Sequence, residues 1–214
     1  MPNWVYCNTS IVGPSEEISR FMAAARGANR YHSPDRITDW GAFTDIQLEA
    51  LMEEAHAHSQ TPNENGFCFH ALYPMPMAIQ ILPYDPGTLQ KAIDTNEGVA
   101  SFCRKHNVSI SGYDWEHQNW GVKWGDCSTS VVEQSDTRVE LYFETAWGAP
   151  HEFWEKVSAD YPTLTITMSY EEEASQFAGE AVFENGVMDL EEWEPEWDRG
   201  NEDEDEGIVE GAPE

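Results

Sequence analysis

The feature that most constrains the fold is an apolar β-hairpin bracketed by Trp-Gly pairs. Residues 128–134 and 138–145 are strand-like runs, and the polar connection from Gln134 to Thr137 is short enough for a tight turn. The second run alternates apolar with polar side chains, which is typical of a strand that buries one face. Asn119–Gly125 precedes the hairpin and Glu144–Gly148 closes it. We therefore expect an antiparallel sheet as the framework of the chain.

Other segments predict further strands and the helices that cover the sheet. Strand patterns occur at residues 3–12, 67–73, 163–170 and 176–184. Helical patterns begin at Ser15, at Thr44 with the spacing of a capping box, at Thr88 and after Ala149-Pro150. The helix from Thr88 to His106 has a possible interruption at 96–98. This mixture predicts an α+β fold, a ferredoxin-like antiparallel sheet with helices packed on one face.

The charge of the chain restricts its partners. The 214 residues include 11 Lys and Arg against 40 Asp and Glu, a formal charge of -29. Such a field repels nucleic acid and anionic membranes and attracts basic surfaces. We therefore expect no direct nucleic-acid binding and no membrane association. Adaptation to high salt is another interpretation of the acidic composition. The scarcity of Lys fits this interpretation, whereas the excess of Glu over Asp and the four Cys fit it less well.

The composition changes near the C-terminus. Residues 1–188 have the composition of a folded domain, with a helical insertion at about 28–60. Residues 189–214 are expected to form an acidic tail, disordered beyond residue 198. Trp193 and Trp197 are four residues apart, so this piece could dock on a groove as one helical turn.

Several short motifs, in order along the chain, resemble the YubB-type ferredoxin-like domain carried by phage and plasmid proteins. They are MPNWVYCNTSIVG at the start, Tyr73–Pro76, Asn119–Trp124, Phe143–Pro150, Tyr161-Pro162, Met168–Glu172 and Phe177–Gly179. The chain departs from the pattern at Gly148, where Ser is usual, in the insertion and in the tail. The resemblance implies a fold and a mobile-element origin, and it implies no catalytic residues.

The Trp-Gly-Val-Lys-Trp segment has two interpretations. Trp120, Lys123, Trp124 and Trp147 could form a site for an anionic or planar ligand. Alternatively, the Trp side chains pack in the core and Lys123 pairs with a carboxylate at the surface. The packing interpretation is favoured, because close packing would produce the same motif.

Enzyme and metal motifs are absent from the sequence. It contains no nucleophile elbow, phosphate-binding loop, HExxH motif or dinucleotide turn. Asp114, Glu116, His117 and Asp126 lie near the Trp segment without the spacing of a metal site, and His56 and His58 alone are a weak zinc signal. Four dispersed Cys indicate reduced thiols. We expect a non-enzymatic cytoplasmic protein of the host cell, with no cofactor and no metal.

The charge and the resemblance together favour an interaction protein. A dense acidic surface can imitate the phosphates of a duplex and occupy the basic groove of a nucleic-acid-binding protein. We expect a phage or plasmid accessory protein that binds a basic host or phage protein in this way, with DNA mimicry against host defence as its specific form. The expected contact residues are Trp193, Trp197, Glu202, Asp203, Glu204, Asp205 and Glu206. The alternative is a ligand-binding or catalytic domain at the Trp segment.

Overall fold

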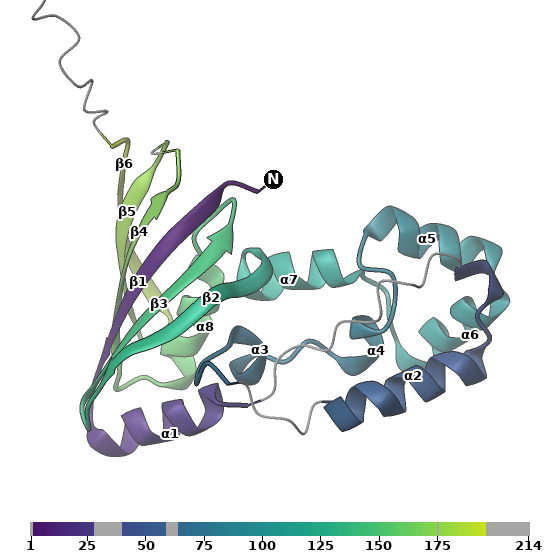
Figure 1. Ribbon diagram of the computed structural model, residues 1–214, viewed down its shortest axis with the longest axis horizontal. Coiled ribbons are helices and arrows are strands. Elements are labelled where there is room, and N and C mark those ends of the chain that lie inside the picture. Colours follow the sequence, from purple (N-terminus) through teal and green to yellow (C-terminus); the bar gives the residue numbers. More distant parts are fainter. Residues whose placement is uncertain (1, 28–39, 59–63, 175, 196–214) are drawn as a thin grey trace, which may run out of the picture.

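A computed structural model describes residues 2–27, 40–58, 64–174 and 176–195 (Figure 1). Six antiparallel strands form one sheet in the order β2-β3-β1-β4-β5-β6. Their bounds are β1 Trp4–Val12, β2 Lys123–Gln134, β3 Arg138–Ala146, β4 Thr165–Glu172, β5 Ala178–Glu184 and β6 Val187–Trp193. The first strand therefore lies inside the sheet, between the hairpin strand β3 and β4.

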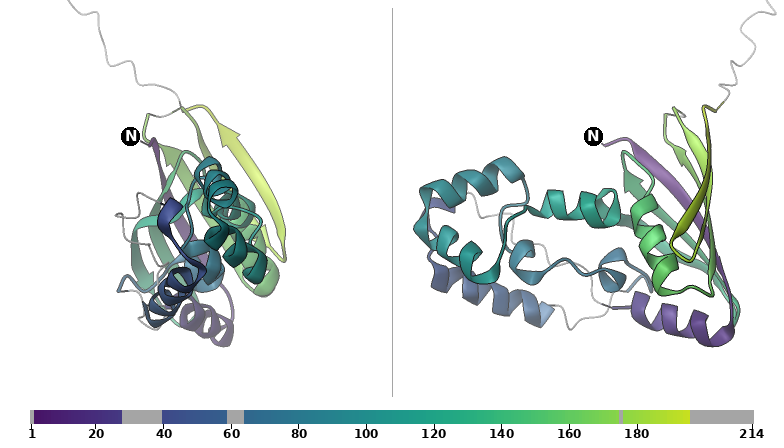
Figure 2. Two further views of the ribbon diagram at one scale, coloured as in Figure 1. Left: turned by 90° about the vertical axis from the view of Figure 1, so that its right-hand side faces the viewer. Right: turned by 180° about the vertical axis from the view of Figure 1, so that it is seen from behind.

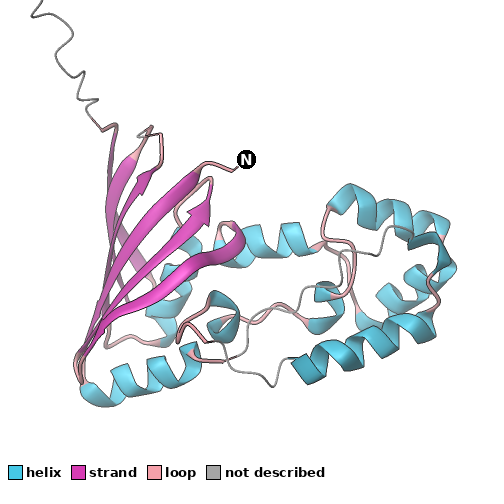
Figure 3. Cartoon of the chain, viewed as in Figure 1, coloured by secondary structure: helices cyan, strands magenta, loops and turns pink. Residues whose placement is uncertain are grey.

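The helices lie on one side of this sheet (Figures 1 and 2). They are α1 Ser15–Ala25, η1 Trp40–Ala42, α2 Asp45–His58, α3 Phe69–Leu72, α4 Met77–Gln80, α5 Pro86–Thr95, α6 Glu97–His106, α7 Gly112–Trp120 and α8 His151–Asp160. Figure 3 shows helices and strands as two separate groups. The expected α+β fold, with helices packed on one face of an antiparallel sheet, is confirmed.

Two apolar clusters hold these elements together. The larger one lies between the sheet and helices α1, α3 and α8, and includes the fully buried Phe67, Phe143 and Trp154. The smaller one joins α2, α4, α5 and α6 around Leu48, Leu89 and Phe102. The second cluster gives the helical lobe in Figure 1 a core of its own, away from the sheet.

Three sequence expectations need correction. The strand expected at 67–73 is wrong: Phe69–Leu72 is the short helix α3, and a brief apolar run cannot distinguish a buried helix from a strand. Gly112–Trp120, where the sequence predicted neither helix nor strand, forms α7, which begins with a Ser111–Asp114 capping box. The boundary expected after residue 188 falls inside β6, whose acidic residues conceal its strand pattern.

The described part of the insertion at 28–60 contains η1 and α2. The Thr44–Gln47 capping box is present, with the Gln47 N–H donating to Thr44 Oγ1 over 3.3 Å and the Thr44 N–H donating to Gln47 Oε1 over 2.9 Å. Among the helices of the described residues, none has the length and apolar character needed to cross a membrane.

Candidate functional site: the uncovered face of the sheet

The two faces of the sheet have different environments. Side chains such as Val5, Phe143 and Ile166 point toward the helices and are fully buried. Their neighbours along each strand point to the opposite face, because side chains alternate in a strand. No described helix covers that opposite face in Figures 1 and 2, and we call it the uncovered face.

The uncovered face is densely acidic. Strand register and alternation place eight carboxylates on it: Glu133, Glu140, Glu144, Glu171, Glu180, Glu184, Asp189 and Glu191. Two pairs of these carboxylates lie directly opposite one another on neighbouring strands, Glu133 with Glu140 and Glu180 with Glu191. Like charges in this position destabilise a sheet. Only Arg138 and Lys123 supply positive charge among the described residues of this face, and Arg138 is already paired with Glu140.

A groove of about 310 Å³ crosses β1, β4, β5 and β6. Its lining includes Tyr6, Asn8, Ser169, Glu171 and Trp193. Tyr6 and Trp193 expose 39% and 47% of their surface, so two aromatic walls are available beside a carboxylate. This combination can hold a Lys or Arg side chain, whose stem packs on the rings while its charge meets Glu171.

The structure divides the Trp segment between the core and the surface. Trp120 is 1% exposed, donates from Nε1 to the Tyr73 carbonyl over 3.1 Å and packs against Phe69 and Trp115. Trp124 and Trp147 are 40% and 48% exposed. The packing interpretation therefore describes Trp120, whereas the other two indoles remain available for contact.

Lys123 lies between the two exposed indoles. Its Nζ is 4.2 Å from the ring centroids of both Trp124 and Trp147. Trp4 is the next ring, with its centroid 6.3 Å from that of Trp124. The carboxylate partner expected for Lys123 is absent from the ion pairs between described residues.

The carboxylates near the Trp segment hold backbone in place and do not gather as a metal site. Glu116 is fully buried and accepts hydrogen bonds from the Tyr84 hydroxyl and from the Trp124 N–H, the latter over 2.7 Å. Asp126 accepts from the Phe69 N–H over 2.7 Å and from the Thr129 hydroxyl. Burial raises the pKa of Asp126, and these hydrogen bonds oppose the rise. Asp114 belongs to the capping box of α7.

The described residues contain no grouped metal ligands, and the pKa values of Cys7 and Cys127 are raised. None of their His, Cys, Asp and Glu side chains form a group of three that could hold a metal ion. Burial raises the pKa of Cys7 to about 12, and burial with nearby carboxylates raises the pKa of Cys127 to about 11. Thiols with raised pKa values are poor nucleophiles.

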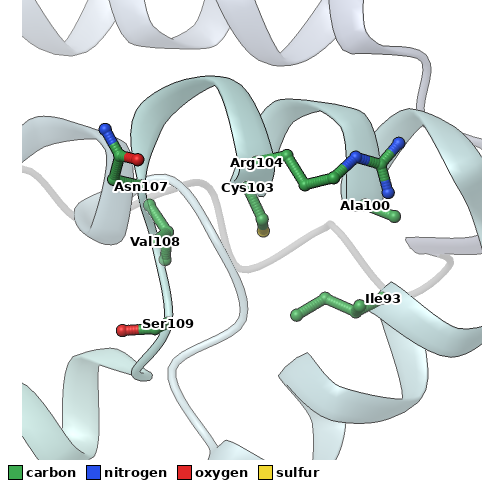
Figure 4. A pocket seen from close by; sticks show the side chains of 7 residues that line it. All are labelled: Ile93, Ala100, Cys103, Arg104, Asn107, Val108 and Ser109. Carbon is green, nitrogen blue, oxygen red and sulfur yellow. The ribbon is translucent and has the colours of Figure 1, made fainter.

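Another pocket, of about 580 Å³, lies in the helical lobe between α5 and α6. Figure 4 shows Ile93 and the Cys103 sulfur directed toward this space, with Arg104 and Asn107 at its edge. Burial raises the pKa of the Cys103 thiol as well. The thiol that lines this pocket is therefore not activated as a nucleophile.

One comparison with known proteins supports the ferredoxin-like fold. Residues 119–210 match the family model described as the ferredoxin-like domain in Api92-like protein. The C-terminal part of the chain is therefore similar to a ferredoxin-like domain of the Api92-like kind, over less than half of the chain. Among solved structures, the chain is similar to the crystal structure of a protein api92 from Yersinia pseudotuberculosis, with 10% identity, a TM-score of 0.46, and 90% of this chain and 98% of that chain covered. A search of curated proteins found no match.

The predicted contact residues have different outcomes. Trp193 lies at the end of β6, opposite Ala178, on the uncovered face and in the groove. Trp197 and the carboxylates from Glu202 to Glu206 lie outside the described residues. The sequence interpretation missed the uncovered face itself. Its signal was present in the alternation of acidic and apolar residues along residues 138–145 and 163–193.

Proposed function

We propose that this protein is a non-enzymatic accessory protein that binds a basic protein partner through the uncovered face of its sheet. The observation that carries the proposal is the presence of eight carboxylates on that face, including the directly opposed pairs Glu133–Glu140 and Glu180–Glu191. Opposed like charges lower the stability of the free protein. A cationic partner would relieve this repulsion when it binds, so the arrangement favours binding over stability.

The groove gives the partner's side chains a specific place to bind. Tyr6 and Trp193 offer aromatic surface, and Glu171 supplies the charge. Buried aromatic contacts commonly carry much of the binding energy at protein interfaces, while surrounding charges accelerate association. The acidic residues Glu202 to Glu206 would add long-range attraction.

We further propose that the partner is a nucleic-acid-binding protein and that the uncovered face imitates the charge of a duplex. The high negative charge and the resemblance to domains of phage and plasmid proteins support this specific form. An inhibitor of host defence would act by occupying the basic groove of its target.

The test is affinity capture from host lysate, at low and high salt, with mass spectrometric identification. The proposal predicts capture of a basic nucleic-acid-binding protein at low salt and its release at high salt. Duplex DNA should compete with this capture if the face imitates DNA. Capture that resists both high salt and DNA would contradict the proposal. Replacement of Glu202 to Glu206 by Gln separates the contribution of the tail: unchanged capture would remove these residues from the binding surface.

A further inference from the structure

We propose that Trp124 and Trp147 form a binding site for an alkylammonium cation, and that Lys123 occupies this site until a ligand displaces it. The Lys123 ammonium is 4.2 Å from both ring centroids, within the range of a cation–π interaction. Two indoles facing one cation form the beginning of an aromatic cage, and Trp4 extends its wall beside Trp124.

The backbone holds both indoles in unusual positions. Trp124 and Trp147 have φ values of 71° and 64°, which bulky residues rarely adopt. The buried Glu116 fixes the Trp124 N–H, and the Asn3 carbonyl accepts from the Trp147 N–H over 2.9 Å. Strained backbone that the surrounding structure enforces is concentrated at functional sites. The two rings are therefore preorganised rather than free to collapse onto the surface.

The charge of the chain decides which kind of ligand fits. An anionic ligand would approach a protein with a net charge of -29, so the field opposes it. A cation is attracted by the same field. A carboxylate is also close to the site: Glu144 is two residues before Ala146 on β3, and Ala146 is the cross-strand partner of both Lys123 and Trp4. The position of Lys123 already demonstrates that the rings accept an alkylammonium group.

Exchange requires only the movement of a flexible side chain. Lys123 is held on β2 opposite Ala146, and its four-carbon stem can swing away without a change in the sheet. A methylated ammonium is less strongly hydrated than Lys123, so it gives up less water on entering the cage. Two sources share this chemistry, a small quaternary ammonium compound and a lysine side chain of a polypeptide.

The experiment follows the indole N–H signals by NMR while choline is added at constant ionic strength. Lys123→Ala should bind choline about tenfold more tightly than the wild-type protein, because two cation–π contacts no longer compete. Lys91→Ala, on α5, removes the same charge away from the site and should leave the affinity at the wild-type value. In the Lys123→Ala background, Trp147→Gly should abolish binding because it removes one of the two indoles. Gly is chosen because it accepts the positive φ of this position. Trp193→Ala, away from the site, should leave binding unchanged.

Two further probes test whether binding depends on positive charge and whether the ligand is a small molecule or a polypeptide lysine. The neutral isostere 3,3-dimethyl-1-butanol should not shift the Trp124 and Trp147 signals; equal shifts by both compounds would overturn the cation site. Nα-acetyl-lysine methylamide represents a polypeptide lysine, and its binding would assign the site to a protein ligand, whereas choline binding alone would assign it to a small molecule. Absence of binding by both cations to folded Lys123→Ala would also overturn the proposal. These probes contain no basic protein, so their outcome is independent of the proposed function.

Discussion

Glu180 on β5 lies directly opposite Glu191 on β6, so two carboxylates occupy one cross-strand position on the uncovered face. Glu133 and Glu140 repeat this arrangement between β2 and β3. A sheet selected only for stability would place opposite charges at such positions. The repeated juxtaposition places part of the acidic excess of the chain on one surface, the surface proposed to bind a partner.

Replacing one member of the Glu180–Glu191 pair tests how much the repulsion between these carboxylates costs in stability. Glu191→Lys should raise the free energy of unfolding by up to about 1 kcal/mol at low salt, because repulsion becomes attraction across the strands. The gain should shrink as salt screens the charges. Urea denaturation measures it, with Glu53→Lys on α2 as the control for net charge. Equal stabilisation by both variants would show that the pair itself is unimportant.

The two roles within the Trp segment predict different effects on stability. Trp120→Ala should lower the free energy of unfolding by about 3–5 kcal/mol, since it removes a buried indole. Trp147→Ala should cost less than about 2 kcal/mol, because nearly half of that side chain is already exposed. Denaturant melts of both variants provide the comparison. Similar losses would contradict the division between core and surface.

Glu116 links α7 to the first residues of β2. Glu116→Gln should cost about 1–2 kcal/mol, because an uncharged amide accepts more weakly from the Tyr84 hydroxyl and the Trp124 N–H. The same change should shift the Trp124 indole signal in an NMR spectrum. Glu53→Gln is the exposed control and should alter neither quantity. An unchanged Trp124 signal would mean that Glu116 does not position this ring.

The raised pKa of Asp126 predicts a pH dependence of stability. The folded protein holds this proton more tightly than the unfolded chain, so the contribution of Asp126 is fully present below its ordinary pKa of 3.8 and is lost as pH rises through the folded pKa. The wild-type protein should therefore lose stability relative to Asp126→Asn as pH rises through this window. Denaturation of both proteins at matched pH values checks the sign. A relative gain for the wild type would contradict the assigned direction.

The thiols should react slowly in the folded protein. Cys7, Cys103 and Cys127 all have raised pKa values, chiefly through burial. A thiol reagent at pH 8 should label them much more slowly in the native protein than in urea, since the thiolate is the reactive form. Rapid labelling of native Cys127 would show that its surroundings are more open than the structure indicates.

Much of the framework could be predicted from local sequence patterns. The alternation at residues 3–12 and 138–145 became β1 and β3, and Ile18, Phe21, Met22 and Ala25 became the buried face of α1. The strand prediction at 67–73 failed because the aromatic residues of this segment are buried from several directions. Burial on all sides removes the periodicity that distinguishes a helix from a strand. In β6 the acidic residues Asp189, Glu191 and Glu192 are exposed and are followed by a longer acidic segment, so composition suggested a tail.

The site was less predictable than the fold. Alternation indicates that Glu140 and Glu144 share a face, but only the register between strands places Glu180 opposite Glu191. The positive φ values of Trp124 and Trp147 also follow from tertiary contacts, because local preference disfavours them. Sequence alone therefore left the Trp segment undivided between core and surface.

The most direct measurement compares partner capture by two variants with the same change in net charge. One variant carries Glu140→Gln, Glu180→Gln and Glu191→Gln on the uncovered face. The other carries Glu53→Gln, Glu54→Gln and Asp94→Asn on the helical lobe. The first variant should lose the salt-sensitive basic partner, and the second should retain it. Equal capture by the two variants would contradict the claim that the uncovered face is the binding surface.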